Sequence, residues 1–204
     1  MTTRQRVARE SVSRDHVAQF FDSDESRAEG VARFLAEGVR LHEPLLVVAH
    51  PSHSAAVVGC LESAGVPTDM LIADGRLLVE DGGELLLRIS HHGMPEAGRF
   101  QDNIGRLVAG LSALGHPRVY GEIVDLLAQR GDLADAIRLE GLWNALAARV
   151  PMSLMCGYAA AHFVPESTHR HLRNICETHA SVHSDAQDSL AAWLLKTAHE
   201  GSPA

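Results

Sequence analysis

The sequence predicts an α/β domain with a mainly parallel sheet and helices on both of its faces. Two observations and one general rule lead to this fold class. Apolar runs such as Leu45–Ala49 are continuous rather than alternating, which is typical of strands covered on both faces. Segments whose apolar residues recur with helical spacing lie between these runs. Parallel neighbours require such helical crossovers, because the chain must return to the same end of the sheet before each new strand.

The expected elements alternate along the chain. In order, they are a strand at His16–Phe21, a helix ending near 41, a strand at Leu45–Ala49, a helix over 54–64, a strand at 70–73, an apolar run at 77–79, an undecided segment at 84–89, a helix over 95–115, a strand at 118–124, a helix after 132, a strand at 152–158, and helices over 167–183 and 185–199. The undecided segment is too short for its periodicity to distinguish a helix from a strand.

Capping residues set the boundaries of the first two helices. Residues 22–24 supply turn and cap side chains before the first helix, and Ser26 with Glu29 is an alternative capping box. The second helix takes Ser52 or Ser54 as its N-cap.

The later helices are bounded by proline, glycine and aspartate. Pro95 suits the first position of the longest helix, whose apolar stripe runs from Phe100 to Leu114 and stops at Gly115. Asp132 is the expected N-cap of the helix that follows. These residues give each helix a defined start or end.

Length and composition favour a single domain with short extensions. The 204 residues, of which 46% are hydrophobic, are enough to bury a substantial core. We expect a flexible basic tail at 1–14, the domain at 15–184, and a C-terminal helix and tail at 185–204. The net charge of −8 disfavours nucleic-acid binding, and no apolar stretch approaches the roughly 20 residues of a membrane span. Three scattered cysteines predict reduced thiols in a cytoplasmic protein.

The turn after Leu45–Ala49 lies where a nucleotide-binding α/β fold keeps its phosphate-binding loop. Such a loop needs glycines to wrap the phosphates, a lysine to neutralise them, and a serine or threonine for Mg²⁺. Against the pattern G-x-P-G-x-G-K-[ST], the segment 49–56 keeps only Pro51. We therefore expect a degenerate P-loop that no longer holds a triphosphate. An ordinary strand, turn and helix is the plain alternative.

Ligands in parallel sheets bind at the carboxyl ends of the strands. Four segments are expected at this end, and we predict that they share one crevice: 50–53, 73–74, 121–122 and 156–158.

Five short motifs occur in order along the chain: His16-Val-Ala-Gln-Phe-Phe21, Gly121-Glu-Ile-Val124, Leu139-Glu-x-x-Trp-Asn144, Cys156-Gly-Tyr158 and Ile175-Cys-x-x-His179. With these motifs the chain resembles the MEDS family, the methanogen/methylotroph DcmR-like sensory domains, from about 16 to 183. The resemblance implies a prokaryotic signal-transduction module of transcription regulation, with a fold similar to the KaiC and RecA ATPase core. It also implies a non-catalytic role in sensing small organic compounds. Phe21 replaces the tyrosine that often ends the first motif of the family.

The resemblance also bears on partners and cofactors. Family members are commonly joined to a histidine-kinase-like ATPase or a DNA-binding domain, and the roughly 20 residues after His183 are too few for either. We therefore expect the signal to pass to a separate protein, such as a kinase or an anti-sigma-type regulator. We expect no cofactor and no metal, no nucleic acid and no membrane among the partners. Because ATPase-like cores often oligomerise, a homo-oligomer is a further alternative.

Eight residues are expected to bind the ligand: His16, Glu122, Glu140, Trp143, Cys156, Tyr158, Cys176 and His179. Glu122 ends a predicted strand, where related ATPases keep a water-activating carboxylate. Glu140 and Trp143 stand three residues apart on a predicted helix, so both can face one pocket. Each residue has a structural alternative, such as a hydrogen-bonded histidine at a strand edge, a buried ion pair, or a core tryptophan.

Two other functions stay open. Cys176 and His179 have i, i+3 spacing and, with Cys156 and His16, could complete a Zn²⁺ set of two thiolates and two imidazoles. A buried thiol beside a capping histidine explains the same spacing. The alternatives to the sensor are therefore a metal- or thiol-redox-responsive switch, and a nucleotide-binding, ATPase-like enzyme that uses Glu122.

Overall fold

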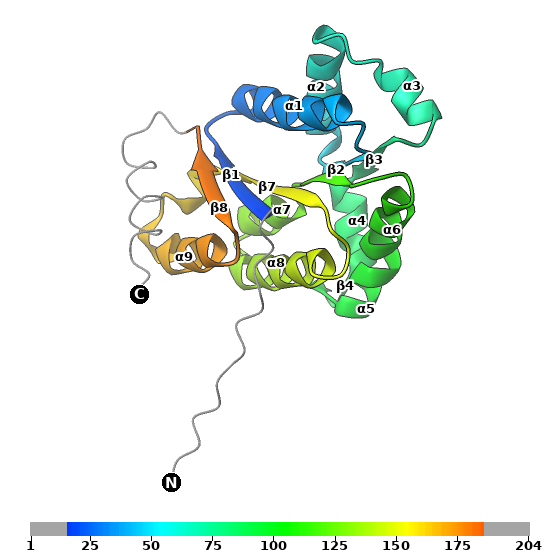
Figure 1. Cartoon of the computed structure of the whole chain (residues 1–204). Coiled ribbons are helices and arrows are strands. Elements are labelled where there is room, and N and C mark those ends of the chain that lie inside the picture. The colour runs from blue at the N-terminus through cyan, green and yellow to red at the C-terminus, as the bar shows by residue number, and fades with distance from the viewer. Residues whose placement is uncertain (1–15, 186–204) are drawn as a thin grey trace.

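The computed structural model describes residues 16–185, which form a six-stranded parallel sheet with helices on both faces (Figure 1). The α/β prediction is therefore confirmed. The strand order is β3-β2-β6-β7-β1-β8, and every neighbouring pair is parallel. The strands of this sheet are β1 (His16–Phe21), β2 (Leu45–Ala49), β3 (Leu77–Asp81), β6 (Arg118–Gly121), β7 (Ser153–Ala159) and β8 (Ser181–Ser184). A separate antiparallel pair consists of β4 (Ser90–His91) and β5 (Met94–Pro95).

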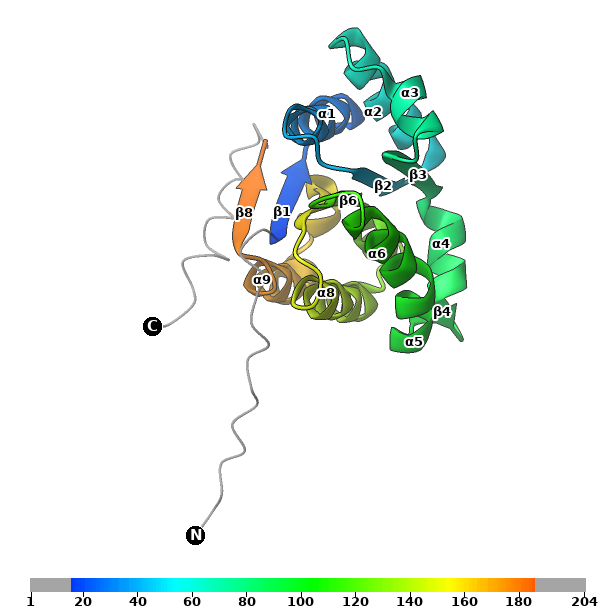
Figure 2. The same ribbon diagram turned by 45° about the vertical axis from the view of Figure 1, so that its right-hand side comes forward.

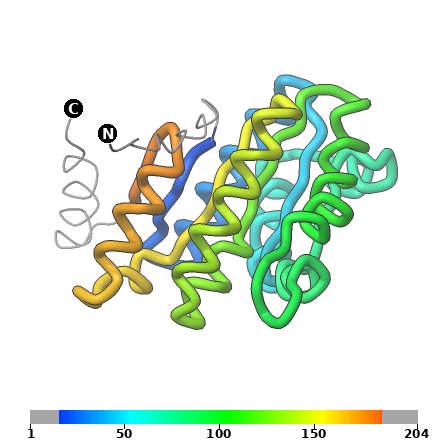
Figure 3. Tube along the Cα trace, turned by 90° about the horizontal axis from the view of Figure 1, so that it is seen from below, coloured from blue at the N-terminus to red at the C-terminus, as the bar shows by residue number. Residues whose placement is uncertain are grey.

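The helices form two layers, one on each face of the sheet (Figure 2). One layer contains α1 (Asp24–Arg40), α2 (Pro51–Ser63) and α3 (Thr68–Ala73). The other contains α4 (Gly82–Ile89), α5 (Ala97–Phe100), α6 (Arg106–Ser112), α7 (Ile123–Gln129), α8 (Leu133–Ala147) and α9 (His169–Glu177). Figure 3 shows α8 and α9 side by side across the second face, where the two helices contact each other.

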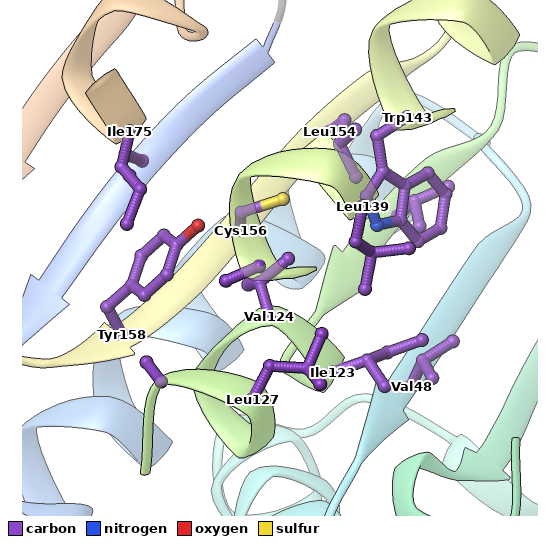
Figure 4. Close-up of a cluster of buried hydrophobic side chains, with 14 of the residues drawn as sticks. Val48, Ile123, Val124, Leu127, Leu139, Trp143, Leu154, Cys156, Tyr158 and Ile175 are labelled. Atoms are coloured by element: carbon purple, nitrogen blue, oxygen red, sulfur yellow. The ribbon is translucent and has the colours of Figure 1, made fainter. Parts of the chain in front are cut away.

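The core is divided by the sheet into two clusters, and the alternation along β2 explains why. Leu46 and Val48 pack into the cluster with α4, α6, α7 and α8, whereas Leu45 and Val47 pack against α1 and α2. All four side chains are buried, so each contributes roughly 1.5 to 3 kcal/mol of hydrophobic free energy. Figure 4 shows part of the larger cluster, with Trp143 at one side and Tyr158 at the other.

Two predicted strands are wrong for a common reason: a short apolar run does not show how the segment is covered. The run at 70–73 belongs to helix α3, with Met70 and Ile72 exposed, and the strand that pairs with β2 is β3. The strand expected at 118–124 ends at Gly121, and Ile123 and Val124 begin α7 as buried helical residues.

The helix expected over 167–183 is also too long. Helix α9 ends at Glu177, and the chain then forms β8, which pairs with β1. The N–H of Ala180 donates to the carbonyl of His16, which starts this pairing. The helix expected over 185–199 and the basic tail at 1–14 lie outside the residues that the structure describes.

The long helix expected from Pro95 is interrupted. Pro95 lies in β5, and Glu96 caps α5 by accepting from the N–H groups of Gly98 and Arg99. A π-helical turn at Gln101–Gly105 then separates α5 from α6. The undecided segment at 84–89 is helical, because Asp81 caps α4.

The first helix is capped from the predicted segment 22–24, whereas the second helix starts earlier than predicted. Ser23 caps α1 in a capping box with Ser26, rather than Ser26 with Glu29. Helix α2 begins at Pro51 and not at Ser54, and its cap is His50, whose imidazole accepts from the Ser52 N–H. The helix therefore starts directly after β2.

Candidate functional site

A pocket of about 320 Å³ opens at the carboxyl ends of β2 and β6. Its walls come from the first turns of α1 and α2, from the segment that follows β6, and from the end of β7. Polar side chains dominate these walls, and they form two connected hydrogen-bond networks around Arg27. The position agrees with the rule that parallel sheets bind ligands where their strands end.

The first network surrounds the carboxylate of Glu122, which is 1% exposed. One oxygen accepts from His53 Nδ1 at 2.7 Å and from the His50 N–H at 3.4 Å. The other accepts from the Tyr120 hydroxyl at 3.2 Å and lies 3.4 Å from Arg27 Nη1. Burial raises the pKa of Tyr120 well above its usual value, so its hydroxyl remains a donor. Protein groups thus surround both oxygens of Glu122.

The second network surrounds Asp125 on α7. One oxygen lies 3.0 Å from Arg27 Nη2, and the other accepts from His162 Nδ1 at 2.8 Å and from the Ala159 N–H at 3.0 Å. Burial alone would raise the pKa of Asp125, but the hydrogen bond from His162 and the charge of Arg27 outweigh burial and lower it. Asp125 is therefore a carboxylate at neutral pH, and it joins α1, α7 and the end of β7.

A second group of polar side chains lies inside the fold, among β1, β7 and α8. His16, Glu140 and Cys156 are completely buried, and His179, which follows α9, is 6% exposed. One potential metal-ligating atom from each of these four residues lies within 4.8 Å of the other three. We call these four residues the buried cluster.

Glu140 is the centre of the buried cluster. Its Oε2 lies 3.2 Å from His16 Nε2 and 3.4 Å from Cys156 Sγ, and its Oε1 lies 3.4 Å from His179 Nε2. The Tyr158 hydroxyl donates a short hydrogen bond to the same carboxylate. Burial alone would raise the pKa of Glu140, but the two histidines hold it well below its usual range. Burial and the neighbouring Glu140 raise the pKa of the Cys156 thiol well above its usual value.

The structure distributes the eight predicted site residues over three places. Five of them meet in or beside the buried cluster: His16, Glu140, Cys156, Tyr158 and His179. Glu122 lies in the pocket at the strand ends. Trp143 packs in the core with its ring 5.2 Å from that of Phe100, and Cys176 is a buried core residue outside the cluster. Figure 4 shows the Trp143 side chain on the far side of Leu139 from Tyr158.

The expectation of one crevice is not met by the segment at 73–74, which ends α3 instead of a strand. The pocket is lined by Ala159, at the end of β7, and not by 156–158.

Three titratable residues of the pocket were not expected there from the sequence: Arg27, Asp125 and His162. Asp125 was hidden because the preceding segment was predicted to continue as a strand. Arg27 had a detectable signal, because it stands four residues before the buried Val31 and so lies on the inward face of α1. His53 lies in the segment 50–53, whose predicted place at the crevice is confirmed.

The described helices include none that combines the length and apolar character of a membrane span.

The fold and its two polar sites define the class of protein: a parallel α/β domain with a ligand-sized pocket at the strand ends. A family model described as "MEDS: MEthanogen/methylotroph, DcmR Sensory domain" matches residues 15–180. The chain therefore belongs to the MEDS family of sensory domains, as its five motifs predicted. A comparison with curated proteins finds no match.

Proposed function

We propose that this chain is a non-catalytic, cytoplasmic sensory domain that binds a small organic ligand and transmits its state to a partner regulator. The observation that supports this proposal most directly is the pocket of about 320 Å³ at the strand ends. That volume falls at the lower end of the range of about 300 to 1,000 Å³ for small-molecule sites. The membership of the MEDS family supports the sensory role.

The side chains around the pocket favour a ligand that donates hydrogen bonds. Three carboxylates, Asp24, Glu122 and Asp125, line it beside the single arginine Arg27. Glu122 and Asp125 already pair with Arg27, whereas the Asp24 side chain is 80% exposed. His53 lies 3.3 Å from Asp24, so a carboxylate and an imidazole are adjacent at the pocket wall. A small amine or alcohol complements this pair of groups.

The surroundings of Glu122 support a role other than catalysis. A carboxylate that activates water must keep an oxygen within reach of that water. In Glu122 both oxygens are engaged by His53, Tyr120 and Arg27. The segment 50–56 also lacks the glycines and lysine that hold a triphosphate, and its Ser52 N–H already donates to His50.

The route of transmission follows from the elements that meet at the pocket. Asp24 begins α1, His53 lies in the first turn of α2, and His162 follows β7. A ligand that contacts two of these groups stabilises one relative position of their elements over another. Such coupling between ligand and partner amounts to about 1 to 3 kcal/mol in typical allosteric proteins, or about 5- to 150-fold in partner affinity. We expect the partner to be a kinase or an anti-sigma-type regulator.

Calorimetric titration with small amines, alcohols, thiols and halocarbons tests the proposal, with magnesium and ATP as a separate arm. An amine or alcohol should release heat and raise the melting temperature, and His53→Gln should weaken binding about tenfold or more. The matched control is His116→Gln, which removes a histidine that contacts Ser153 at the amino end of β7. Binding and hydrolysis of ATP would instead support the ATPase-like alternative. If no compound in the panel shifted the melting temperature, the proposed ligand class would be wrong.

A further inference from the structure

The buried cluster takes no part in the function proposed above, and none of its four residues lines the pocket at the strand ends. Its residues come from four places in the chain: β1, α8, β7 and the turn after α9. A charged side chain such as that of Glu140 is rarely buried unless it is paired or binds a metal. The cluster therefore needs a physical explanation of its own.

The distances within the buried cluster fit a four-coordinate metal. Zn²⁺ binds nitrogen and oxygen at about 2.0 to 2.2 Å and sulfur at about 2.3 Å, so ligand atoms of a tetrahedral site lie roughly 3.3 to 3.6 Å apart. His16 Nε2 lies 3.2 Å from both Cys156 Sγ and Glu140 Oε2, and the latter two atoms are 3.4 Å apart. His179 Nε2 lies 3.4 Å from the other oxygen of this carboxylate, Oε1. The four candidate ligand atoms lie within 4.8 Å of one another, so they have to draw together before an ion can be bound at the centre.

Hydrogen bonds on the outer side of both imidazoles fix which nitrogen faces inward. The Asn144 amide nitrogen donates to the Thr178 carbonyl at 2.8 Å, so its oxygen must accept from His16 Nδ1, which lies 3.1 Å away. His179 Nδ1 lies 2.7 Å from the Ile175 carbonyl, which can only accept. Both Nδ1 atoms therefore carry the proton, and both Nε2 atoms point at the cluster. Metal-bound histidines are held in this way by their outer hydrogen bonds.

The charge of the ligand set gives a further argument. The Nε2 atoms of His16 and His179 face the Glu140 carboxylate, and His16 Nε2 also lies beside the Cys156 thiol. Among the described residues, His179 Nε2 is a buried nitrogen without a hydrogen-bond partner. A divalent cation with one thiolate and one carboxylate is electrically neutral.

We propose that His16, Glu140, Cys156 and His179 bind one Zn²⁺ ion through two imidazole nitrogens, one carboxylate oxygen and one thiolate. On binding, the Cys156 S–H bond breaks, its proton leaves to solvent, and a zinc–sulfur bond forms. The site is of the closed, structural type, because its four protein ligands fill a tetrahedral shell. It fastens the segment after α9 to β1, β7 and α8. Glu140 takes the place that the sequence alone suggested for Cys176.

Cobalt substitution tests this proposal in the untagged full chain. The protein is freed of metal by chelation and titrated with Co²⁺, which takes tetrahedral zinc sites and gives an absorption band from sulfur-to-cobalt charge transfer. We expect saturation at one equivalent, the charge-transfer band, and its loss when one equivalent of Zn²⁺ is added. Cys156→Ser should abolish the band and weaken Zn²⁺ binding at least tenfold, whereas Cys176→Ser should retain both.

A second variant keeps the test decisive if Cys156→Ser does not fold. The chain has three cysteines, so the double variant C60S/C176S leaves Cys156 as the sole thiol. This variant should show the same band and the same stoichiometry as the wild-type chain. Failure to bind Co²⁺, binding without the band, or loss of the band in C60S/C176S would each overturn the proposal. The measurement is independent of the organic ligand, so its outcome does not depend on the proposed sensory function.

Discussion

Replacement of Arg27 by methionine should destabilise the fold strongly. The Arg27 guanidinium, 3% exposed as a residue, lies 3.4 Å from Glu122 and 3.0 Å from Asp125. Methionine keeps an apolar side chain but removes the guanidinium, which lies over the Phe21 ring, and leaves two buried carboxylates without their cation. Removing one partner of a buried ion pair costs about 3 to 5 kcal/mol, because the remaining charge stays buried and uncompensated. If the free energy of unfolding falls by about 2 kcal/mol per M of urea, the midpoint of urea unfolding should fall by roughly 2 M.

The matched control lies on the same helix. Arg40 pairs with Glu37 on the exposed side of α1, so Arg40→Met removes the same side-chain type from an ion pair in solvent. Exposed pairs contribute little to stability, and the unfolding midpoint of this variant should stay close to that of the wild-type chain. Asp125→Asn in the Arg27→Met background should recover part of the loss, because it removes one uncompensated charge. Equal midpoints for Arg27→Met and Arg40→Met would refute the reasoning.

Three further predictions concern pH, packing and capping. Folding lowers the pKa of Asp125, so the stability that this carboxylate contributes is complete above about pH 4, the ordinary pKa of an unfolded aspartate, and is lost as the pH falls through the folded pKa. Urea unfolding at decreasing pH should therefore show a smaller loss of stability for Asp125→Asn than for the wild-type chain. Equal losses in the two proteins would contradict this prediction. In Gly157→Ala the new Cβ would lie 2.5 Å from the hydroxyl and 2.7 Å from a ring carbon of the fully buried Tyr120, so thermal unfolding should reveal a loss of about 1 to 3 kcal/mol, and an unchanged melting temperature would show that the ring can yield. Ser23→Ala removes the capping box with Ser26 and should cost about 1 kcal/mol by urea unfolding, whereas Ser23→Gly should cost only a few tenths, and equal costs would argue against a side-chain cap.

The fold class was predictable because a strand that is buried on both faces is apolar at every position. Leu45–Ala49 is apolar at every position, and the structure buries every one of these side chains. The predictions of secondary structure failed where the burial of a segment does not follow its hydrophobicity. Met70 and Ile72 are exposed on a short helix, and β8 is a polar strand whose place is fixed by pairing with β1.

The candidate sites were predictable only in part. Cys156 and Tyr158 stand two residues apart on one strand, so period-two alternation correctly places both on the same face. Cys176 and His179 do not share a helical face, because α9 ends at Glu177 before the histidine is reached. The i, i+3 spacing of these two residues therefore does not place them on one face of a helix. Nothing in the local sequence reveals that Glu140, from α8, meets His179 instead.

Strands β1 and β7 run from the buried cluster towards the pocket at the strand ends. At one end of β1 stands His16 of the buried cluster, and at the other stands Phe21, against which the Arg27 guanidinium lies. Cys156 and the Ala159 N–H that binds Asp125 are likewise only three residues apart on β7. A β-strand rises about 3.3 Å per residue, so its backbone is nearly fully extended. Both strands therefore lead from the buried cluster to the partners of Arg27 and Asp125 without an intervening loop.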